Sequence, residues 1–223
     1  PEAGFRPCIW YTEEYQRMCD LMTESVLKDK TLKEKFKNIK KIYFSRRKFG
    51  KAVATEFGEE YIEQCFNQNG YESLGPETLT LREQIYVWNH AEAIACMNGT
   101  IPLNVVFCKN EKLKLTILNK MSIYHKNPYI YLYMRNIQAE FIDIYKEPLK
   151  GYPKSLGEGP YLIKTGKEFF HYCQREKFEI PYTGMKLKFY DLKQEIRYYL
   201  CVIGIGNKIR RVGSYIKRKM LRR

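Results

Sequence analysis

Residues 80–107, TLREQIYVWNHAEAIACMNGTIPLNVVF, predict a helix, a buried strand, a polar turn and a second helix in succession. Leu81, Ile85 and Trp88 fall at i, i+4 and i+7, so they predict the apolar face of the first helix. Residues 92–96, EAIAC, are too few for a helix and favour a buried strand. This order of elements is typical of a crossover unit in an α/β sheet.

The turn Asn98-Gly99-Thr100 lies between the predicted strand and the second predicted helix. In open α/β sheets, ligands bind beyond the carboxyl ends of the strands. A helix that begins there directs unpaired N–H groups and a partial positive charge toward the ligand. The turn is therefore predicted to hold an anion, most simply a phosphate.

On both sides of this stretch, strand and helix patterns alternate. Strands are predicted at residues 39–45, 71–74, 113–118 and 139–145, and lysines alternating with leucines favour an edge position for 113–118. Helices are predicted at residues 12–26, 57–69, 128–136 and 165–177. We therefore expect an α/β fold, with a Rossmann-like parallel sheet flanked by helices.

Length and composition set the class of protein. A chain of 223 residues, 44% of them hydrophobic, can bury a substantial core. The seven cysteines form no CxxC pair and the three histidines have no ligand-like spacing, so we expect no metal site and a reducing compartment. The first residue is Pro1 rather than Met, so we expect the natural amino terminus to be missing.

Positive charge is concentrated near the carboxyl end of the chain. The net charge is +14, and residues 193–223 hold ten Lys or Arg against one acid. In residues 207–223, Ile209, Val212, Ile216 and Met220 recur at spacings of 3, 4 and 4 among eight cations. This pattern predicts a basic amphipathic helix on an anionic membrane surface. With no transmembrane run, it favours a cytoplasmic protein peripheral to the membrane and no nucleic-acid partner.

A second basic segment follows the predicted strand at 39–45. Arg46 and Arg47 come directly after that strand, with Lys51 and Glu56 a few residues further on. Guanidinium groups can make two-point contacts with phosphate oxygens. Charge alone also fits a solvated basic turn. Since this segment and the Asn98-Gly99-Thr100 turn should end at one edge of the sheet, we expect them to form one anion-binding crevice.

The order of these segments resembles a known family. SRRK, a Glu shortly after it, PETLTLREQ, an acid before a short apolar strand, and NGT-x-x-x-N-x-x-F resemble the carboxyl-terminal half of glycosyltransferase family 61, over roughly residues 40–111. That family includes bacterial capsular polysaccharide enzymes and eukaryotic xylosyl- and N-acetylglucosaminyltransferases. The resemblance implies the C-terminal domain of a GT-B glycosyltransferase. It also implies inverting, metal-independent transfer from a nucleotide sugar, most simply UDP-linked, with no other cofactor.

Matching the family pattern residue by residue assigns the site. Together with the predicted crevice, the resemblance leads us to expect the donor to be bound by Arg46, Arg47, Lys51, Gln84, Asn98, Gly99, Thr100 and Asn104. Glu56 is the candidate catalytic carboxylate, with an ion pair to Arg46 or Arg47 as an equal alternative. The chain departs from the pattern at Lys51 (commonly Arg), Thr55 (Asn), Asn98 (His) and Pro102 (a small or apolar residue). Asn98 can donate a hydrogen bond but cannot titrate near neutrality as His does.

The resemblance also divides the chain. Residues 1–38 are expected to be a helical lead-in from a missing N-terminal domain, 39–180 the nucleotide-sugar-binding domain, and 181–223 a basic amphipathic tail. The predicted function is transfer of a sugar to a glycan, polysaccharide or lipid-linked acceptor. The alternatives are a catalytically degenerate relative that binds a nucleotide sugar or a partner, and, less favoured, a basic nucleic-acid-binding protein.

Overall fold

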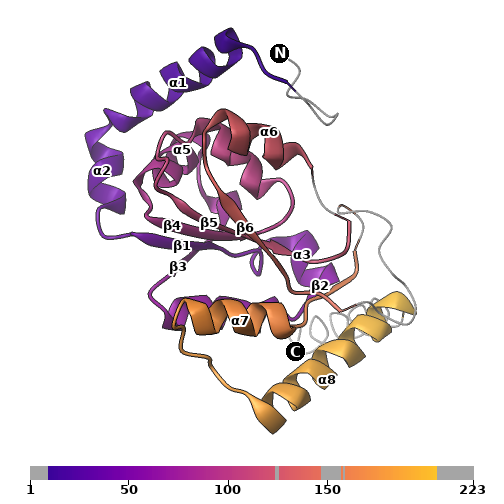
Figure 1. Ribbon diagram of the computed structural model, residues 1–223. Coiled ribbons are helices and arrows are strands. Elements are labelled where there is room, and N and C mark those ends of the chain that lie inside the picture. Colours follow the sequence, from indigo (N-terminus) through magenta and orange to yellow (C-terminus); the bar gives the residue numbers. More distant parts are fainter. Residues whose placement is uncertain (1–9, 124–125, 147–156, 158, 205–223) are drawn as a thin grey trace, which may run out of the picture.

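The computed structural model describes residues 10–123, 126–146, 157 and 159–204. Its centre is a five-stranded sheet in the order β3-β1-β4-β5-β6, in which every neighbouring pair is parallel (Figure 1). The strands are β1 (Lys41–Phe44), β3 (Glu72–Leu74), β4 (Ala93–Met97), β5 (Lys114–Asn119) and β6 (Ala139–Asp143). The predicted α/β fold with a parallel sheet is confirmed.

The strand order determines where a ligand can bind. The first strand, β1, lies between β3 and β4, so the chain winds outward from it in both directions. This is the flavodoxin-like doubly wound order, in which ligands bind where the winding reverses. Here that point lies between the carboxyl ends of β1 and β4. The edge position predicted for residues 113–118 is wrong, since β5 lies between β4 and β6 and only Lys114 is exposed.

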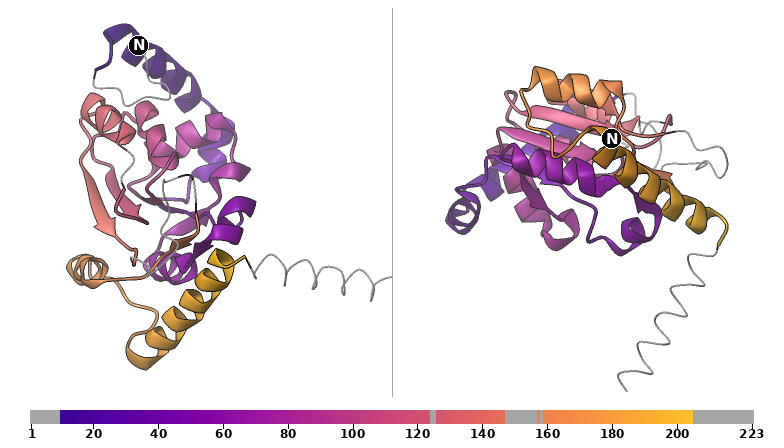
Figure 2. Two further views of the ribbon diagram at one scale, coloured as in Figure 1. Left: turned by 90° about the vertical axis from the view of Figure 1, so that its right-hand side faces the viewer. Right: turned by 90° about the horizontal axis from the view of Figure 1, so that it is seen from below.

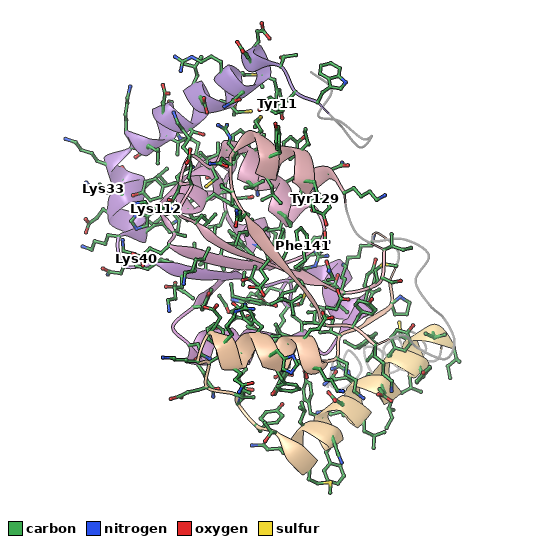
Figure 3. The ribbon with its side chains drawn as sticks, in the orientation of Figure 1. Tyr11, Lys33, Lys40, Lys112, Tyr129 and Phe141 are labelled. Carbon is green, nitrogen blue, oxygen red and sulfur yellow. The ribbon has the colours of Figure 1, made fainter. Side chains whose placement is uncertain are left out.

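One face of the sheet is covered by five helices. These are α1 (Glu13–Leu27), α2 (Lys30–Phe36), α5 (Leu81–His90), the 3₁₀-helix η2 (Ile101–Phe107) and α6 (Asn127–Met134). Trp88 on α5 stacks on Phe44 of β1, with ring centroids 5.9 Å apart. Tyr129 on α6 stacks in the same way on Phe141 of β6, at 5.2 Å (Figure 3). Aromatic packing thus joins this helical layer to both a central and an edge strand.

Two local predictions for this layer need correction. Leu81 is half exposed instead of facing the core, because it is the first residue of α5, where Thr80 and Glu83 form a capping box. The helix predicted after Asn98-Gly99-Thr100 is the seven-residue 3₁₀-helix η2. A short 3₁₀-helix has poorer hydrogen-bond alignment than an α-helix. Its N–H groups are therefore less well aligned toward an anion than those of the helix that the sequence predicted.

The other face is covered by α4 (Glu59–Gln68) and α7 (Lys167–Arg175), and α8 (Gly184–Val202) packs outside this layer and against the strands β2 and β7 (Figure 2). Tyr190 of α8 connects to α4: its hydroxyl donates to Gly58 O (3.1 Å) and accepts from Tyr61 N (3.2 Å). Tyr198 of α8 is fully buried. The first part of the predicted tail is therefore a helix packed on the domain. Residues 205–223, which include the predicted basic helix, lie outside the described residues.

A small second sheet lies beside the carboxyl ends of the large one. After α3 (Gly50–Thr55), residues Glu56–Phe57 form β2, which pairs in parallel with β7 (Tyr161–Leu162). The helix predicted from residue 57 begins instead at Glu59. Gly58, with φ +110°, makes the turn between β2 and α4. This turn places Glu56 in a strand that faces the end of β1.

Candidate functional site

A cavity of about 370 Å³ opens at the carboxyl edge of the large sheet. The segment after β1 provides Arg46, Phe49, Lys51, Thr55 and Glu56; the turn after β4 provides Gly99 and Thr100; and Lys120, Gly157 and Tyr161 complete the lining. These segments follow the two strands that flank the reversal of strand order, so the cavity occupies the position where doubly wound sheets bind ligands.

Glu56 holds two cations at the floor of this cavity. Arg46 Nε lies 3.1 Å from each carboxylate oxygen of Glu56, and Lys120 Nζ lies 2.8 Å from Oε1. The side chains of Glu56 and Lys120 are only 2% and 4% exposed. Because both oxygens already accept hydrogen bonds from cations, the contacts fit the ion-pair role of Glu56 that the sequence left open.

Lys120 is the main residue of this cavity that the sequence analysis did not assign. Its ammonium group also lies 4.0 Å from the centroid of the Tyr161 ring. Burial lowers the pKa of Lys120, and the adjacent charge of Glu56 opposes this effect. A usable signal was present: Lys120 follows the buried strand at 113–118, just as Arg46 follows the strand at 39–45.

The charge and shape of the cavity favour an anion. Among the described residues of its lining, Arg46, Lys51 and Lys120 are opposed by one carboxylate, that of Glu56. A Cβ added to Gly99 would meet nothing within 4 Å, so the backbone of this turn is open to an approaching group. A partly enclosed site with excess cations is suited to phosphate oxygens.

A buried carboxylic acid supports the backbone of Arg46 from behind. Glu59 Oε1 accepts hydrogen bonds from Arg46 N at 2.8 Å and from the Tyr43 hydroxyl at 3.1 Å. Burial raises the pKa of Glu59 to about 7. Because Glu59 is 3% exposed and does not line the cavity, it orients Arg46 and has no path to a ligand there.

Arg47 lies apart from Arg46. Its guanidinium contacts Glu63 Oε2 at 2.8 Å and Glu60 Oε1 at 3.3 Å, both on α4. It lines two other hollows, one with α4 and one with Ser45 and Gly75. The structure therefore brings one arginine of the predicted pair to the cavity, and the other faces α4.

Gln84 and Asn104 contact each other outside the cavity lining. Asn104 Nδ2 donates to Gln84 Oε1 at 2.8 Å, and Gln84 Nε2 donates to the carbonyl oxygens of Pro76 and Leu79 at 3.0 and 3.2 Å. These bonds connect η2, α5 and the short 3₁₀-helix η1 (Pro76–Thr78). Their described contacts are those of structural residues.

Asn98 is buried beneath the turn. Its Nδ2 donates to Asn119 Oδ1, and Asn119 Nδ2 donates to Asp143 Oδ1, both at 2.8 Å. These residues link the carboxyl ends of β4, β5 and β6. Of the predicted site, the cavity thus contains Arg46, Lys51, Glu56, Gly99 and Thr100, whereas Asn98 lies behind it.

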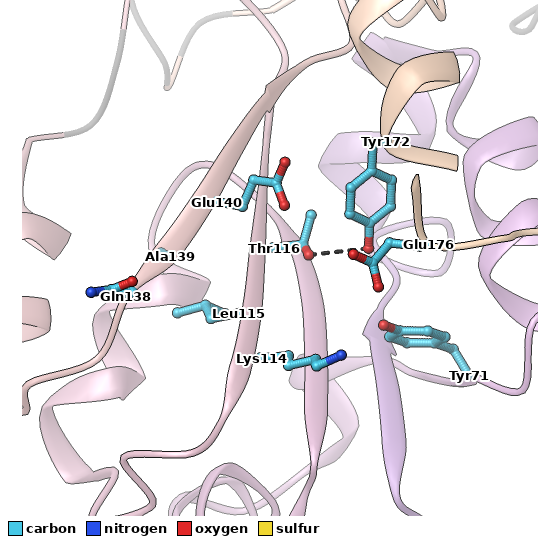
Figure 4. A pocket seen from close by; sticks show the side chains of 9 residues that line it. All are labelled: Tyr71, Lys114, Leu115, Thr116, Gln138, Ala139, Glu140, Tyr172 and Glu176. Carbon is cyan, nitrogen blue, oxygen red and sulfur yellow. Dashed lines mark hydrogen bonds between the residues drawn. The ribbon is translucent and has the colours of Figure 1, made fainter. Parts of the chain in front are cut away.

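A second cavity, of about 320 Å³, lies at the opposite end of the strands (Figure 4). Lys114 and Ala139, the first residues of β5 and β6, line it with Tyr172 of α7. The Tyr172 hydroxyl lies 3.2 Å from Thr116 Oγ1. Two glutamates also face this cavity, so its charge balance differs from that of the cavity at the carboxyl edge.

The fold and this site define an α/β protein with a cationic crevice at the reversal of its parallel sheet. The family model described as Glycosyltransferase 61 matches residues 9–116. The first half of the described chain is thus similar to glycosyltransferase 61, and the matched segment includes β1, β4 and the loops that follow them. No curated protein matches the chain. In the part of the chain that the structure describes, no group of three His, Cys, Asp or Glu residues could hold a metal ion.

Proposed function

We propose that this domain binds the diphosphate of a nucleotide sugar in the crevice between β1 and β4. The bound sugar is then transferred to a glycan, polysaccharide or lipid-linked acceptor. The observation that carries this proposal is the group of Arg46, Lys51 and Lys120 around the open Gly99 backbone. The glycosyltransferase 61 match supports the reaction class. We assign a UDP-linked donor and the C-terminal position in a GT-B enzyme by resemblance to the family.

In the proposed reaction, the three cations stabilise the negative charge that develops on the departing diphosphate. They supply positive charge where a metal ion would otherwise be needed, in keeping with metal-independent, inverting transfer. Glu56 acts as a positioning residue, because its carboxylate holds Arg46 and Lys120 through both oxygens. The general base that removes the acceptor proton is assigned to the partner domain of the GT-B arrangement.

The test compares two exposed lysines three residues apart. Lys51 lines the crevice, whereas Lys48 lines the separate hollow beside Arg47. We expect Lys51→Ala to weaken UDP binding about tenfold in isothermal titration, since it removes one charged contact to phosphate. The matched Lys48→Ala should leave the affinity unchanged. Equal affinities for both variants and the unaltered protein, or no UDP binding at all, would contradict the proposed crevice.

A second candidate is a relative that binds a nucleotide sugar without transferring it. Two observations favour it: Glu56 is engaged by two cations, and Asn98 stands where the family commonly has His. The two candidates differ in one measurement. UDP release from a UDP-sugar in the presence of a glycan acceptor supports transfer, whereas UDP binding with no turnover supports the binding relative.

The sequence of residues 207–223 supports a further part of the proposal. Its eight cations and no acids are suited to anionic lipid headgroups, each cation adding about 1 kcal/mol near the surface. We propose that this segment keeps a cytoplasmic enzyme at the membrane, where capsular or other lipid-linked glycans are assembled. Deleting it should reduce binding to anionic vesicles and leave UDP binding intact.

A further inference from the structure

Helix α8 has an unpartnered apolar side within the described part of the chain. Met185, Phe189, Leu192 and Ile196 recur at spacings of 4, 3 and 4, so they lie along one side of the helix. Each of the four is between 52% and 66% exposed. We call them the α8 outer stripe. In Figure 1, α8 lies at the margin of the molecule, with the domain on one side of it.

The charges of α8 are sorted between its two sides. Its acids pair with lysines of the domain: Glu195 with Lys146 at 2.8 Å and with Lys164 at 2.9 Å, and Asp191 with Lys164 at 3.8 Å. Lys186, Lys188 and Lys193 are exposed and flank the outer stripe. The outward side of α8 is therefore apolar along its centre and positive along its borders.

We propose that the α8 outer stripe binds the surface of an anionic phospholipid bilayer, with the helix lying in the plane of the interface. An amphipathic helix of this type inserts its apolar side among the acyl chains while its lysines contact anionic headgroups. A second copy of the chain is a poorer occupant, because it would place the bordering lysines of both copies together. No helix within the described ranges is long and apolar enough to cross a bilayer.

This surface differs from the tail at residues 207–223, and it is rigidly connected to the crevice. The Tyr198 ring of α8 packs edge-on against Phe57 of β2, at 6.3 Å between centroids. Cys201 Sγ lies 3.7 Å from the Ala54 carbonyl of α3. Since α3, β2 and β7 also form the wall of the crevice, contact through α8 would hold the crevice beside the lipid headgroups.

The first test reports on α8 alone. Phe189→Trp in the full chain places an indole in the outer stripe. The emission of Trp10 and Trp88, measured in the unaltered protein, is subtracted. With vesicles of mixed phosphatidylcholine and phosphatidylglycerol, we expect the added indole emission to shift to shorter wavelength, because the ring leaves water. Vesicles of phosphatidylcholine alone should give a smaller shift. No shift with the mixed vesicles would overturn the proposal.

The second test measures partitioning. Phe189→Ser combined with Leu192→Ser should lower the affinity for mixed vesicles about tenfold, since two inserted side chains are lost. The matched control, Met18→Ser with Leu21→Ser on α1, removes two half-exposed apolar side chains outside the stripe and should have no effect. Unchanged affinity of the α8 variant would overturn the proposal. The proposal would also be overturned if the unaltered protein formed a dimer without lipid and the α8 variant did not. UDP titration of the same variant reports separately on the crevice.

Discussion

At the scale of single residues, Glu56 organises the charges of the crevice. Removing a carboxylate from water costs free energy, so the stability of the folded state depends on Glu56 keeping both of its cationic partners. The 2.8 Å contact with Lys120 and the paired 3.1 Å contacts with Arg46 meet this requirement. The same contacts fix the two cations where a diphosphate would bind.

The dependence of Glu56 on its partners can be measured. Glu56→Gln should lower the free energy of unfolding by about 3 kcal/mol, because it leaves Lys120 buried without its carboxylate. Adding Lys120→Met should recover more than half of this loss, since the buried ammonium group is then removed together with its carboxylate. Chemical denaturation of the two single variants and the double variant gives the coupling free energy between Glu56 and Lys120. Strictly additive effects would show that the pair contributes nothing to stability.

Glu59 predicts a pH dependence of stability. Its pKa is raised by burial from 4.5 to about 7, so the native state binds its proton more tightly than the unfolded state does. The contribution of Glu59 is therefore fully present below pH 4.5 and is lost as the pH rises through about 7. Glu59→Gln, which retains an acceptor for Arg46 N, should reduce this loss.

The measurement is the melting temperature of both proteins across that pH range. Glu59→Gln should melt above the unaltered protein on the alkaline side of pH 7 and close to it near pH 4.5. A difference between the two proteins that does not vary with pH would exclude Glu59 as the titrating group.

At the scale of elements, the turn between β2 and α4 determines where Glu56 lies. Gly58 has φ +110°, and a Cβ there would stand 2.1 Å from the Ile163 carbonyl oxygen. Its own carbonyl accepts the hydrogen bond of Tyr190 from α8. Only glycine at position 58 lets the end of β2 lie this close both to Ile163, which follows β7, and to α8.

A matched pair of glycines tests this explanation. Gly58 and Gly70 both have positive φ, but a Cβ at Gly70 would meet nothing within 4 Å. Gly58→Ala and Gly70→Ala thus share the backbone strain, and only Gly58→Ala adds a clash. We expect Gly58→Ala to cost about 2 kcal/mol more in urea denaturation. Equal losses would show that Ile163 moves aside without cost.

At the scale of the whole molecule, the strand order brings distant segments together. The loops after β1, β4 and β5 are well separated in the sequence, yet Arg46, Gly99 and Lys120 line one cavity. Helix α8 closes the same region from outside through Tyr190 and Tyr198. The crevice wall and the α8 outer stripe therefore belong to one packed unit, which is why a membrane contact through α8 would orient the crevice.

The sequence by itself determined the fold class, and it predicted a site at the edge of the sheet where the structure has a cavity. Alternating helical and strand periodicities predicted the parallel sheet, and the segments that follow two strands predicted Arg46, Lys51, Gly99 and Thr100 as neighbours. These are local patterns, and the carboxyl ends of parallel strands meet at one edge. The resemblance to glycosyltransferase family 61 came from the order of the same segments.

Tertiary structure alone decided the direction and partner of each side chain. Sequence patterns could not distinguish Arg46 from Arg47, because both follow the same strand. In the structure their side chains point in different directions, and Arg46 pairs with Glu56 while Arg47 pairs with α4. Nor could sequence patterns show that Gln84 and Asn104 bond to each other, or that Lys120 completes the crevice. Ion pairs and buried amide contacts join residues far apart in the chain, so they arise only when the sheet brings its loops together.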